Sequence, residues 1–203
     1  MSLVDGSLVV VRGAGDLATG CIVRLVKSGF RVVALEAERP TAIRRAVSLC
    51  EAVWDGEAAV EGVRAFRCDA APASWGRLDV PLLIDPDARA VAHLAPLALV
   101  DAILAKRNLG TRIGMAPVVV GVGPGFVAGG DVNAVVETSR GHDLGRVLLS
   151  GSAAPDTGVP GLIAGEGRAR VLHAPVAGAV KALVALGDVV EAGAPVLAVG
   201  EVV

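Results

Sequence analysis

Runs of aliphatic residues alternate with amphipathic or polar segments through the first three quarters of the chain. The runs predict strands at residues 9–12, 31–35, 60–66, 80–84, 117–122, 133–137 and 147–149. Helical spacing of apolar residues predicts helices at 17–28, from 40 to about 53, and at 96–107. Continuous aliphatic strands are typical of parallel sheets that are buried on both faces. The pattern therefore predicts an α/β fold with a Rossmann-like, mostly parallel sheet.

The amino-acid composition changes after residue 150. Residues 151–167 are rich in Gly, Pro, Ser and Ala, which indicates a linker or long loop between a domain at 1–150 and a small β module at 168–203. That module resembles half of a biotinyl/lipoyl-type barrel, a fold that carries its cofactor on a lysine of an exposed hairpin. No lysine follows Lys181, which precedes the turn at Gly187. The resemblance therefore implies a structural module and not a carrier.

A glycine-rich turn follows the first predicted strand. Gly13 permits a tight turn, Gly15 allows backbone amides to approach a phosphate, and Ala18 lets the helix pack close to the strand. Glu36 ends the second predicted strand, where a carboxylate accepts hydrogen bonds from a ribose. The helix N-terminus adds free donors and a positive dipole. This layout predicts a site for a phosphorylated ligand; the alternative is a tight turn that binds nothing.

Charges around this turn modify the prediction. Asp16 favours the helix dipole but repels a pyrophosphate, and Arg12 is placed to offset that repulsion. Three arginines downstream of Glu36 allow a 2′-phosphate or another anion as an alternative to a free ribose; these are Arg39, Arg44 and Arg45. A solvated helix face explains the last two equally well.

Two later segments are candidates for the opposite wall of the site. Gly123 and Gly125 lie in a second glycine loop after a predicted strand, where loops of an α/β sheet line the ligand crevice. The polar segment at 131–146 offers Arg140 and Arg146 for an anion and His142 as a proton donor. A simple sharp turn is the alternative for the glycine loop.

Composition narrows the classes of function. The 203 residues carry a net charge of −2 without a basic patch, which argues against nucleic acid as a partner. Three scattered cysteines, without a metal-ligand spacing, fit buried thiols in a reducing compartment and predict no metal site. The uncharged stretch at 113–130 contains two prolines and several glycines, so it indicates a buried strand and a loop, not a membrane span.

Several motifs together resemble a known family. They are Val-Arg-Gly-Ala-Gly-Asp-Leu-Ala-Thr-Gly at 11–20, Pro-Thr-Ala-Ile-Arg-Arg at 40–45, Ala-Lys-Arg-Asn-Leu-Gly-Thr at 105–111, Met-Ala-Pro at 115–117 with Gly-Pro-Gly-Phe at 123–126, Glu-Thr-Ser-Arg-Gly-His-Asp-Leu-Gly-Arg-Val at 137–147, and Thr-Gly-Val-Pro-Gly at 157–161. The chain resembles the accessory proteins of selenium-dependent molybdenum hydroxylase systems, which are related in role to xanthine dehydrogenase accessory proteins.

The resemblance implies a cytoplasmic maturation protein that binds a nucleotide or a molybdopterin-type cofactor and docks on molybdenum hydroxylase subunits. We expect a homo-oligomer, with the β module serving dimerisation or docking. The alternative is an NAD(P)-dependent oxidoreductase acting on a small substrate, with His142 as its proton donor. The family supplies no catalytic residue to carry over.

Overall fold

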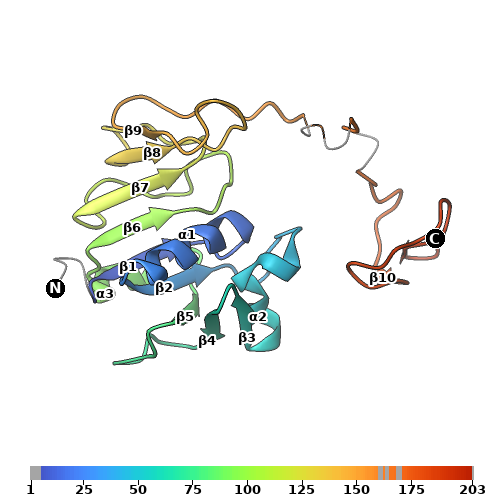
Figure 1. Cartoon of the computed structure of the whole chain (residues 1–203), viewed down its shortest axis with the longest axis horizontal. Coiled ribbons are helices and arrows are strands. Elements are labelled where there is room, and N and C mark those ends of the chain that lie inside the picture. The colour runs from blue at the N-terminus through green and yellow to red at the C-terminus, as the bar shows by residue number, and fades with distance from the viewer. Residues whose placement is uncertain (1–5, 160–161, 163–164, 168–170, 203) are drawn as a thin grey trace. The chain divides into compact units, whose positions relative to one another are not determined.

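A computed structural model describes residues 6–159, 162, 165–167 and 171–202. The chain divides into two compact units, Met1–Asp156 and Thr157–Val203. The boundary falls within the segment at 151–167 that composition marked as a linker. Figure 1 shows the elements of both units.

The first unit is built on a nine-stranded sheet with the order β3-β4-β5-β2-β1-β6-β7-β8-β9. Strands from β4 to β8 pair in parallel, and the two edge pairs, β3–β4 and β8–β9, are antiparallel. The strands are β1 (Leu8–Arg12), β2 (Arg31–Glu36), β3 (Glu57–Val60), β4 (Val63–Arg67), β5 (Asp79–Ile84), β6 (Ala98–Asp101), β7 (Val118–Val122), β8 (Ala134–Val136) and β9 (Val147–Leu148).

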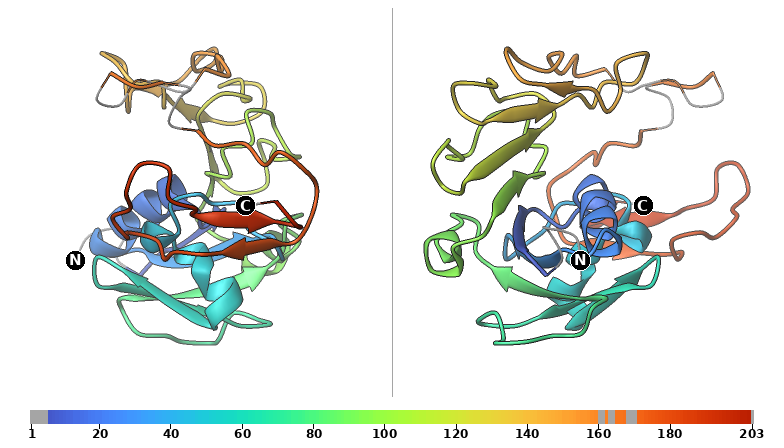
Figure 2. Two further views of the ribbon diagram at one scale, coloured as in Figure 1. Left: turned by 90° about the vertical axis from the view of Figure 1, so that its right-hand side faces the viewer. Right: turned by 60° about the vertical axis from the view of Figure 1, so that its left-hand side comes forward.

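The strand order reverses between β1 and β6. The chain runs from β1 outward through β2 to β5, then returns to the other side of β1 and continues through β6, β7 and β8. In open α/β sheets the ligand crevice lies at such a reversal, outside the carboxyl ends of the strands. The predicted α/β, Rossmann-like fold is thus confirmed, and Figure 2 shows the sheet from two further directions.

Few helices accompany this sheet. α1 (Asp16–Lys27) follows β1, and the short helices η1 (Arg45–Val47), η2 (Leu49–Glu51) and α2 (Ala52–Asp55) follow β2. α3 (Ala90–Leu94) follows β5. Ala18 and Ile22 of α1 are fully buried against the sheet, so the apolar stripe of this helix faces the core.

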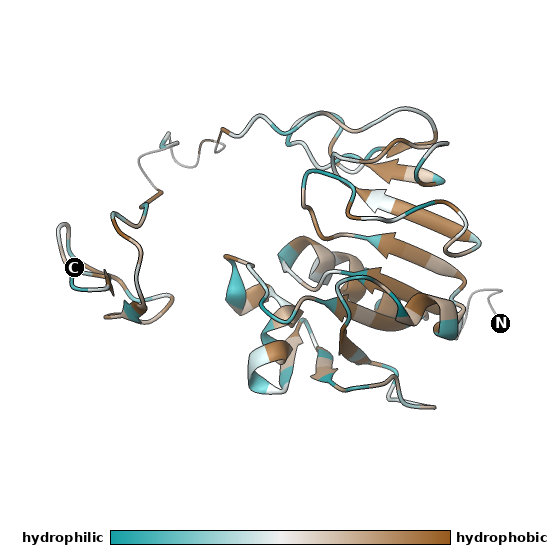
Figure 3. Ribbon diagram, turned by 180° about the vertical axis from the view of Figure 1, so that it is seen from behind, coloured by the Kyte–Doolittle hydropathy of each residue, from teal (hydrophilic) through white to brown (hydrophobic). Residues whose placement is uncertain are grey.

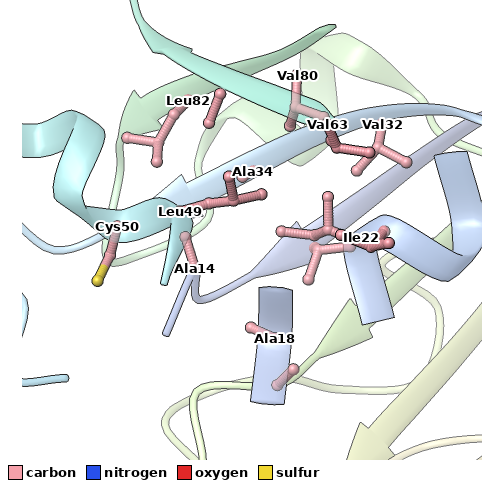
Figure 4. Close-up of a cluster of buried hydrophobic side chains, with 14 of the residues drawn as sticks. Ala14, Ala18, Ile22, Val32, Ala34, Leu49, Cys50, Val63, Val80 and Leu82 are labelled. Atoms are coloured by element: carbon pink, nitrogen blue, oxygen red, sulfur yellow. The ribbon is translucent and has the colours of Figure 1, made fainter. Parts of the chain in front are cut away.

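The core has two halves, one on each face of the sheet. On the α1 face, aliphatic side chains of β1, β2, β4 and β5 pack against α1 and η2 (Figure 4). On the opposite face, Val10, Val33 and Leu99 pack with α3 and with loop residues such as Phe126. Figure 3 shows the strands as the most hydrophobic part of the unit.

Two predicted helices are wrong, and one predicted strand has different bounds. The helix expected from 40 to about 53 is a loop followed by η1, η2 and the start of α2. The strand expected at 60–66 is present as β4 (Val63–Arg67), but its first residues form a turn at Glu61 and Gly62, both with positive φ, which joins it to the unpredicted strand β3. The helix expected at 96–107 is β6 and a loop, because Leu99 and its neighbours enter the sheet beside β1.

The second unit contains β10 (Val180–Ala182) and β11 (Leu197–Val199), paired antiparallel. Lys181 lies on β10. Some residues of the predicted β module, 168–170 and 203, lie outside the described residues, as does part of the motif at 157–161. In the described part of the chain, no helix has the length and apolarity needed to cross a bilayer.

Candidate functional site

The first glycine turn joins β1 to α1, and its two glycines, Gly13 and Gly15, have different structural roles. Gly13 has φ +94°, and a Cβ there would lie 3.1 Å from the carbonyl oxygen of Ala102, at the end of β6. Its amide donates to the Leu35 carbonyl at 2.7 Å. Gly15 has an ordinary φ of −65°, and the nearest atom to a Cβ there is that of Ala42 at 3.7 Å. A glycine is thus required at residue 13 because the loop after β6 packs against it, whereas a side chain at residue 15 would meet no atom closer than 3.7 Å.

The N-terminus of α1 follows directly. In the described part of the chain, the amides of Gly15, Asp16 and Leu17 donate no hydrogen bond to the protein. Asp16 forms an ion pair with Arg44, from the loop after β2, and not with Arg12. The positive charge expected to offset Asp16 therefore comes from Arg44, which is exposed at the same helix end.

Arg12 instead occupies the interior, at the reversal of strand order. Its guanidinium lies 3.1 Å from Asp101 Oδ2 at the end of β6, and both side chains are almost fully buried, with exposures of 3% and 2%. It also donates to the Thr111 hydroxyl and to the carbonyls of Pro86 and Leu109. The expectation that Arg12 neutralises Asp16 is wrong, because its donors are used to join the ends of β1 and β6 to two loops.

Glu36 holds the turn from the end of β2. One carboxylate oxygen accepts the Ala14 amide and the other accepts the Ala37 amide, each at 2.7 Å. Burial raises the pKa of Glu36, and these two amide bonds act in the opposite direction. Each carboxylate oxygen has a second lone pair, so the group retains acceptor capacity for a ligand hydroxyl.

A crevice of about 100 Å³ opens at this position. It lies over the carboxyl ends of β1, β2, β5 and β6, and its lining residues are Arg12, Gly13, Leu35, Glu36, Ala37, Asp85, Pro86, Ile103 and Leu109. The structure thus brings three predicted site residues to one place: Arg12, Gly13 and Glu36. Sequence reasoning missed the lining from the loops after β5 and β6. An aspartate ending the aliphatic run of β5 was the available signal for Asp85.

The second glycine loop does not line this crevice. Gly123 has φ +84°, and a Cβ there would lie 2.8 Å from Leu104 Cδ1. Gly125 has φ +108°, and a Cβ there would lie 2.6 Å from Arg107 Cα. The loop after β6 therefore packs directly on both glycines. The absence of side chains at these two glycines permits this close contact. The structure thus agrees with the alternative interpretation of the glycine loop as a simple sharp turn.

The polar segment after β8 also lies away from the crevice lining. Arg140 and His142 are exposed, and Arg146 pairs with Asp143 at 3.0 Å. β8 is three strands from β1, which places it roughly 14 Å away along the same sheet edge. As for the glycine loop, the structure does not bring these residues together with the first turn.

Glu137 has a structural role at the end of β8. Its carboxylate accepts the amides of Ser139 and Ala154, each at 2.7 Å, and is largely buried. These amide bonds lower the pKa of Glu137. The side chain thus ties the β8–β9 connection to the segment that follows β9, a structural task.

The three arginines after Glu36 differ in whether they form an ion pair. Arg44 pairs with Asp16, and Arg45 donates to Glu51 at 2.8 Å through Nε. Arg39 is exposed, and the described residues offer it no ion pair. Of the three candidates for an anion, Arg39 is therefore the cation that the fold leaves unengaged.

Comparison with known proteins adds one relative. The chain is 50% identical over 197 residues to Escherichia coli (strain K12) YqeB, which is named an uncharacterized protein. The match covers 96% of this chain and 36% of YqeB. The chain thus spans little more than a third of the length of the curated relative it matches. No family model matches the sequence, and no solved structure matches it.

Proposed function

We propose that the first unit binds a phosphorylated cofactor, a nucleotide or a molybdopterin-type ligand, in the crevice between β1, β2 and β6. The observation that carries the proposal is the position of this crevice at the reversal of strand order, lined by Gly13 and Glu36. Loops at the carboxyl ends of parallel strands form the ligand site in folds of this class.

The local chemistry supports a phosphate beside Gly15. Within the described residues the amides of Gly15, Asp16 and Leu17 donate no hydrogen bond, and the twelve-residue helix adds its dipole. Pairing with Arg44 reduces the repulsion that Asp16 exerts on an anion. Glu36 is fixed by two amides and is placed to accept a hydroxyl of the ligand.

The crevice is small for a whole cofactor, since sites that enclose a drug-sized ligand measure about 300–1,000 Å³. We therefore assign it only the sugar or pterin ring edge beside Glu36, with the phosphate at the N-terminus of α1 beside Gly15 and the remainder of the ligand on the exposed loop after β2. Arg39 on that loop is the cation available to a further anionic group.

The role we assign to this binding is accessory: the protein handles the cofactor during maturation of a molybdenum hydroxylase, in the cytoplasm. This part rests on the sequence motifs at 11–20 and 137–147 and on their resemblance to such accessory proteins. Hydride transfer is the less favoured alternative, because its proton donor, His142, is not among the residues that line the crevice.

Calorimetric titration and thermal shift with ADP, NAD⁺, NADP⁺ and molybdopterin test the proposal, since a ligand that binds the native state raises the melting temperature. We expect Gly15→Val to abolish the shift while the unliganded protein still melts cooperatively. Gly20→Val is the matched control, because Gly20 lies in α1 and has no atom within 4 Å of a Cβ.

Three results would count against this function. No shift with any of these ligands would leave the turn without a ligand. Equal affinity in Gly15→Val and the parent chain would remove the site from this turn. Turnover of NAD(P)H with a small substrate would replace the accessory role by the oxidoreductase.

A further inference from the structure

The crevice at the reversal of strand order carries an excess of negative charge. Within the described residues, the charged members of its lining are Arg12, Glu36 and Asp85. Arg12 is already compensated by Asp101, 3.1 Å away, so it offers no net positive charge to a ligand. The carboxylates of Glu36 and Asp85 remain. An anionic group beside them would be repelled and would lose part of its hydration, so the crevice disfavours a phosphate.

The two carboxylates are held by backbone amides and not by cations. In the part of the chain that the structure describes, neither Glu36 nor Asp85 forms an ion pair. Glu36 accepts the two amides described above, and Asp85 accepts the amides of Arg89 and Ala90 at 3.0 and 2.8 Å. These neutral donors fix the carboxylates in place without cancelling their charge.

The arginines that could hold a 2′-phosphate are engaged elsewhere or lie outside the lining. Arg44 pairs with Asp16, and Arg45 pairs with Glu51. Arg39 is exposed on the loop after β2 and does not line the crevice. The group that enters the crevice therefore meets acceptors and apolar side chains, and no uncompensated cation.

Arg12 fixes the two loops that form the walls of the crevice. Its Nη2 donates to the Pro86 carbonyl at 2.7 Å, on the loop after β5, and to the Leu109 carbonyl at 3.3 Å, on the loop after β6. A site whose walls are already ordered loses less entropy when it binds a ligand. Leu35 and Ile103 add apolar surface to the lining, which suits the edge of a ring.

The free lone pairs of Glu36 determine which neutral group fits. An ionised carboxylate only accepts hydrogen bonds, and each oxygen of Glu36 keeps one acceptor position after binding its amide. Two adjacent donors on a ligand can satisfy both oxygens together, as the paired donors of a guanidinium do. The cis-diol of a ribose presents two such donors. The aminopyrimidine edge of a pterin presents them as well.

We infer that the crevice is a subsite for a neutral ligand edge with two adjacent hydrogen-bond donors, and that Glu36 excludes a phosphate from it. The edge is the cis-diol of a ribose or the aminopyrimidine edge of a pterin. The inference rests on the proposed function and deepens it, because it limits the ligand to a nucleotide without a 2′-phosphate or to a pterin cofactor. NADP⁺ is thereby excluded.

Calorimetry on the whole chain tests the subsite with five probes: AMP, AMP without its 2′-hydroxyl, AMP with an added 2′-phosphate, a pterin phosphate, and its analogue with an oxo group in place of the 2-amino group. Whichever of AMP and the pterin phosphate binds more tightly identifies the source of the donors. Removing one donor from that compound should weaken binding about tenfold or more, as expected for a lost hydrogen bond to a charged group. The 2′-phosphorylated AMP should bind at least tenfold more weakly than AMP.

Variants of the lining assign this selectivity to the crevice. Ala37→Arg adds a cation beside Glu36 and should raise the affinity for 2′-phosphorylated AMP at least tenfold. Ala59→Arg is the matched control, because it adds the same charge at an exposed position of β3, outside the lining, and should leave that affinity unchanged. Glu36→Gln should also reduce the discrimination against the 2′-phosphate. Ala37→Arg decides the matter if Glu36→Gln does not fold.

The outcomes separate this inference from the proposed function. Binding that is unaffected by the loss of a donor would overturn the inference and leave the cofactor site standing. Tighter binding of 2′-phosphorylated AMP than of AMP would overturn it too, and loss of that preference in Arg39→Ala would identify Arg39 as the partner of the phosphate. Binding of none of the five probes would refute the proposed function itself, and the subsite with it.

Discussion

The buried ion pair between Arg12 and Asp101 provides the sharpest test of the fold. In Asp101→Asn the shape of the side chain is kept and its charge is lost. The Arg12 guanidinium, whose side chain is only 3% exposed, would remain buried beside a neutral amide. Removing one partner of such a pair destabilises a protein by about 3–5 kcal/mol, because the remaining charge is not compensated. We expect a loss of this size, a large part of the 5–15 kcal/mol that is typical of a folded domain.

Urea unfolding followed by tryptophan fluorescence measures this loss. Trp54 and Trp75 both lie in the first unit, so the signal reports on the unit that contains the ion pair. With a slope of about 2 kcal/mol/M, the midpoint should fall by roughly 1.5–2.5 M. A fall of less than about 0.5 M would refute the reasoning.

The double variant Arg12→Met/Asp101→Leu is the control for charge. It removes both ionic groups, and aliphatic replacement of a buried pair is often tolerated or even stabilising. We therefore expect it to be more stable than Asp101→Asn. The opposite order would mean that the hydrogen bonds to Thr111 and the two loop carbonyls, not the charge pair, hold this region together.

Three further predictions concern other parts of the first unit. Gly125→Ala should destabilise more than Gly129→Ala in urea unfolding, because both have positive φ but only the first places a Cβ against Arg107; equal losses would contradict the packing role. Leu49→Ala should cost about 2–5 kcal/mol, since Leu49 is fully buried, and a loss below 1 kcal/mol would argue against the α1-side core. Glu137→Gln should be less stable than the parent at pH 7. Because the folded-state pKa of Glu137 is lowered, its contribution is present above the unfolded pKa and is lost as the pH falls through the folded value, so the two proteins should converge in acid; a constant difference would contradict this sign.

The sequence predicted the fold correctly where a strand is recognisable from its own residues. β1, β2 and β5 read as continuous aliphatic runs because they are buried on both faces or nearly so. The β6 segment was predicted as a helix, since Leu99 and its apolar neighbours also fit a helical spacing. Its place between β1 and β7 is a tertiary outcome that local pattern does not contain.

The residues of the candidate site also differ in how well local sequence predicted them. Gly13 and Glu36 were predictable because the turn and the following strand end lie within one short unit of sequence. The partner of Arg12 was not, because Asp101 lies 89 residues further along the chain. A signal existed: an arginine that ends an aliphatic strand requires a buried carboxylate, and Asp101 ends another aliphatic run. Applying it would have corrected the role given to Arg12.

The position of β1 in the middle of the sheet sets an order for folding during synthesis. β1 can pair with β2 as soon as residue 36 has emerged, but its other edge waits until β6 is made. Until then Arg12 has no carboxylate beside it, and the exposed edge of β1 is free to pair with any strand nearby. A nascent chain that stops short of residue 101 therefore combines an uncompensated Arg12 with an open edge on β1, and both favour aggregation until β6 pairs there.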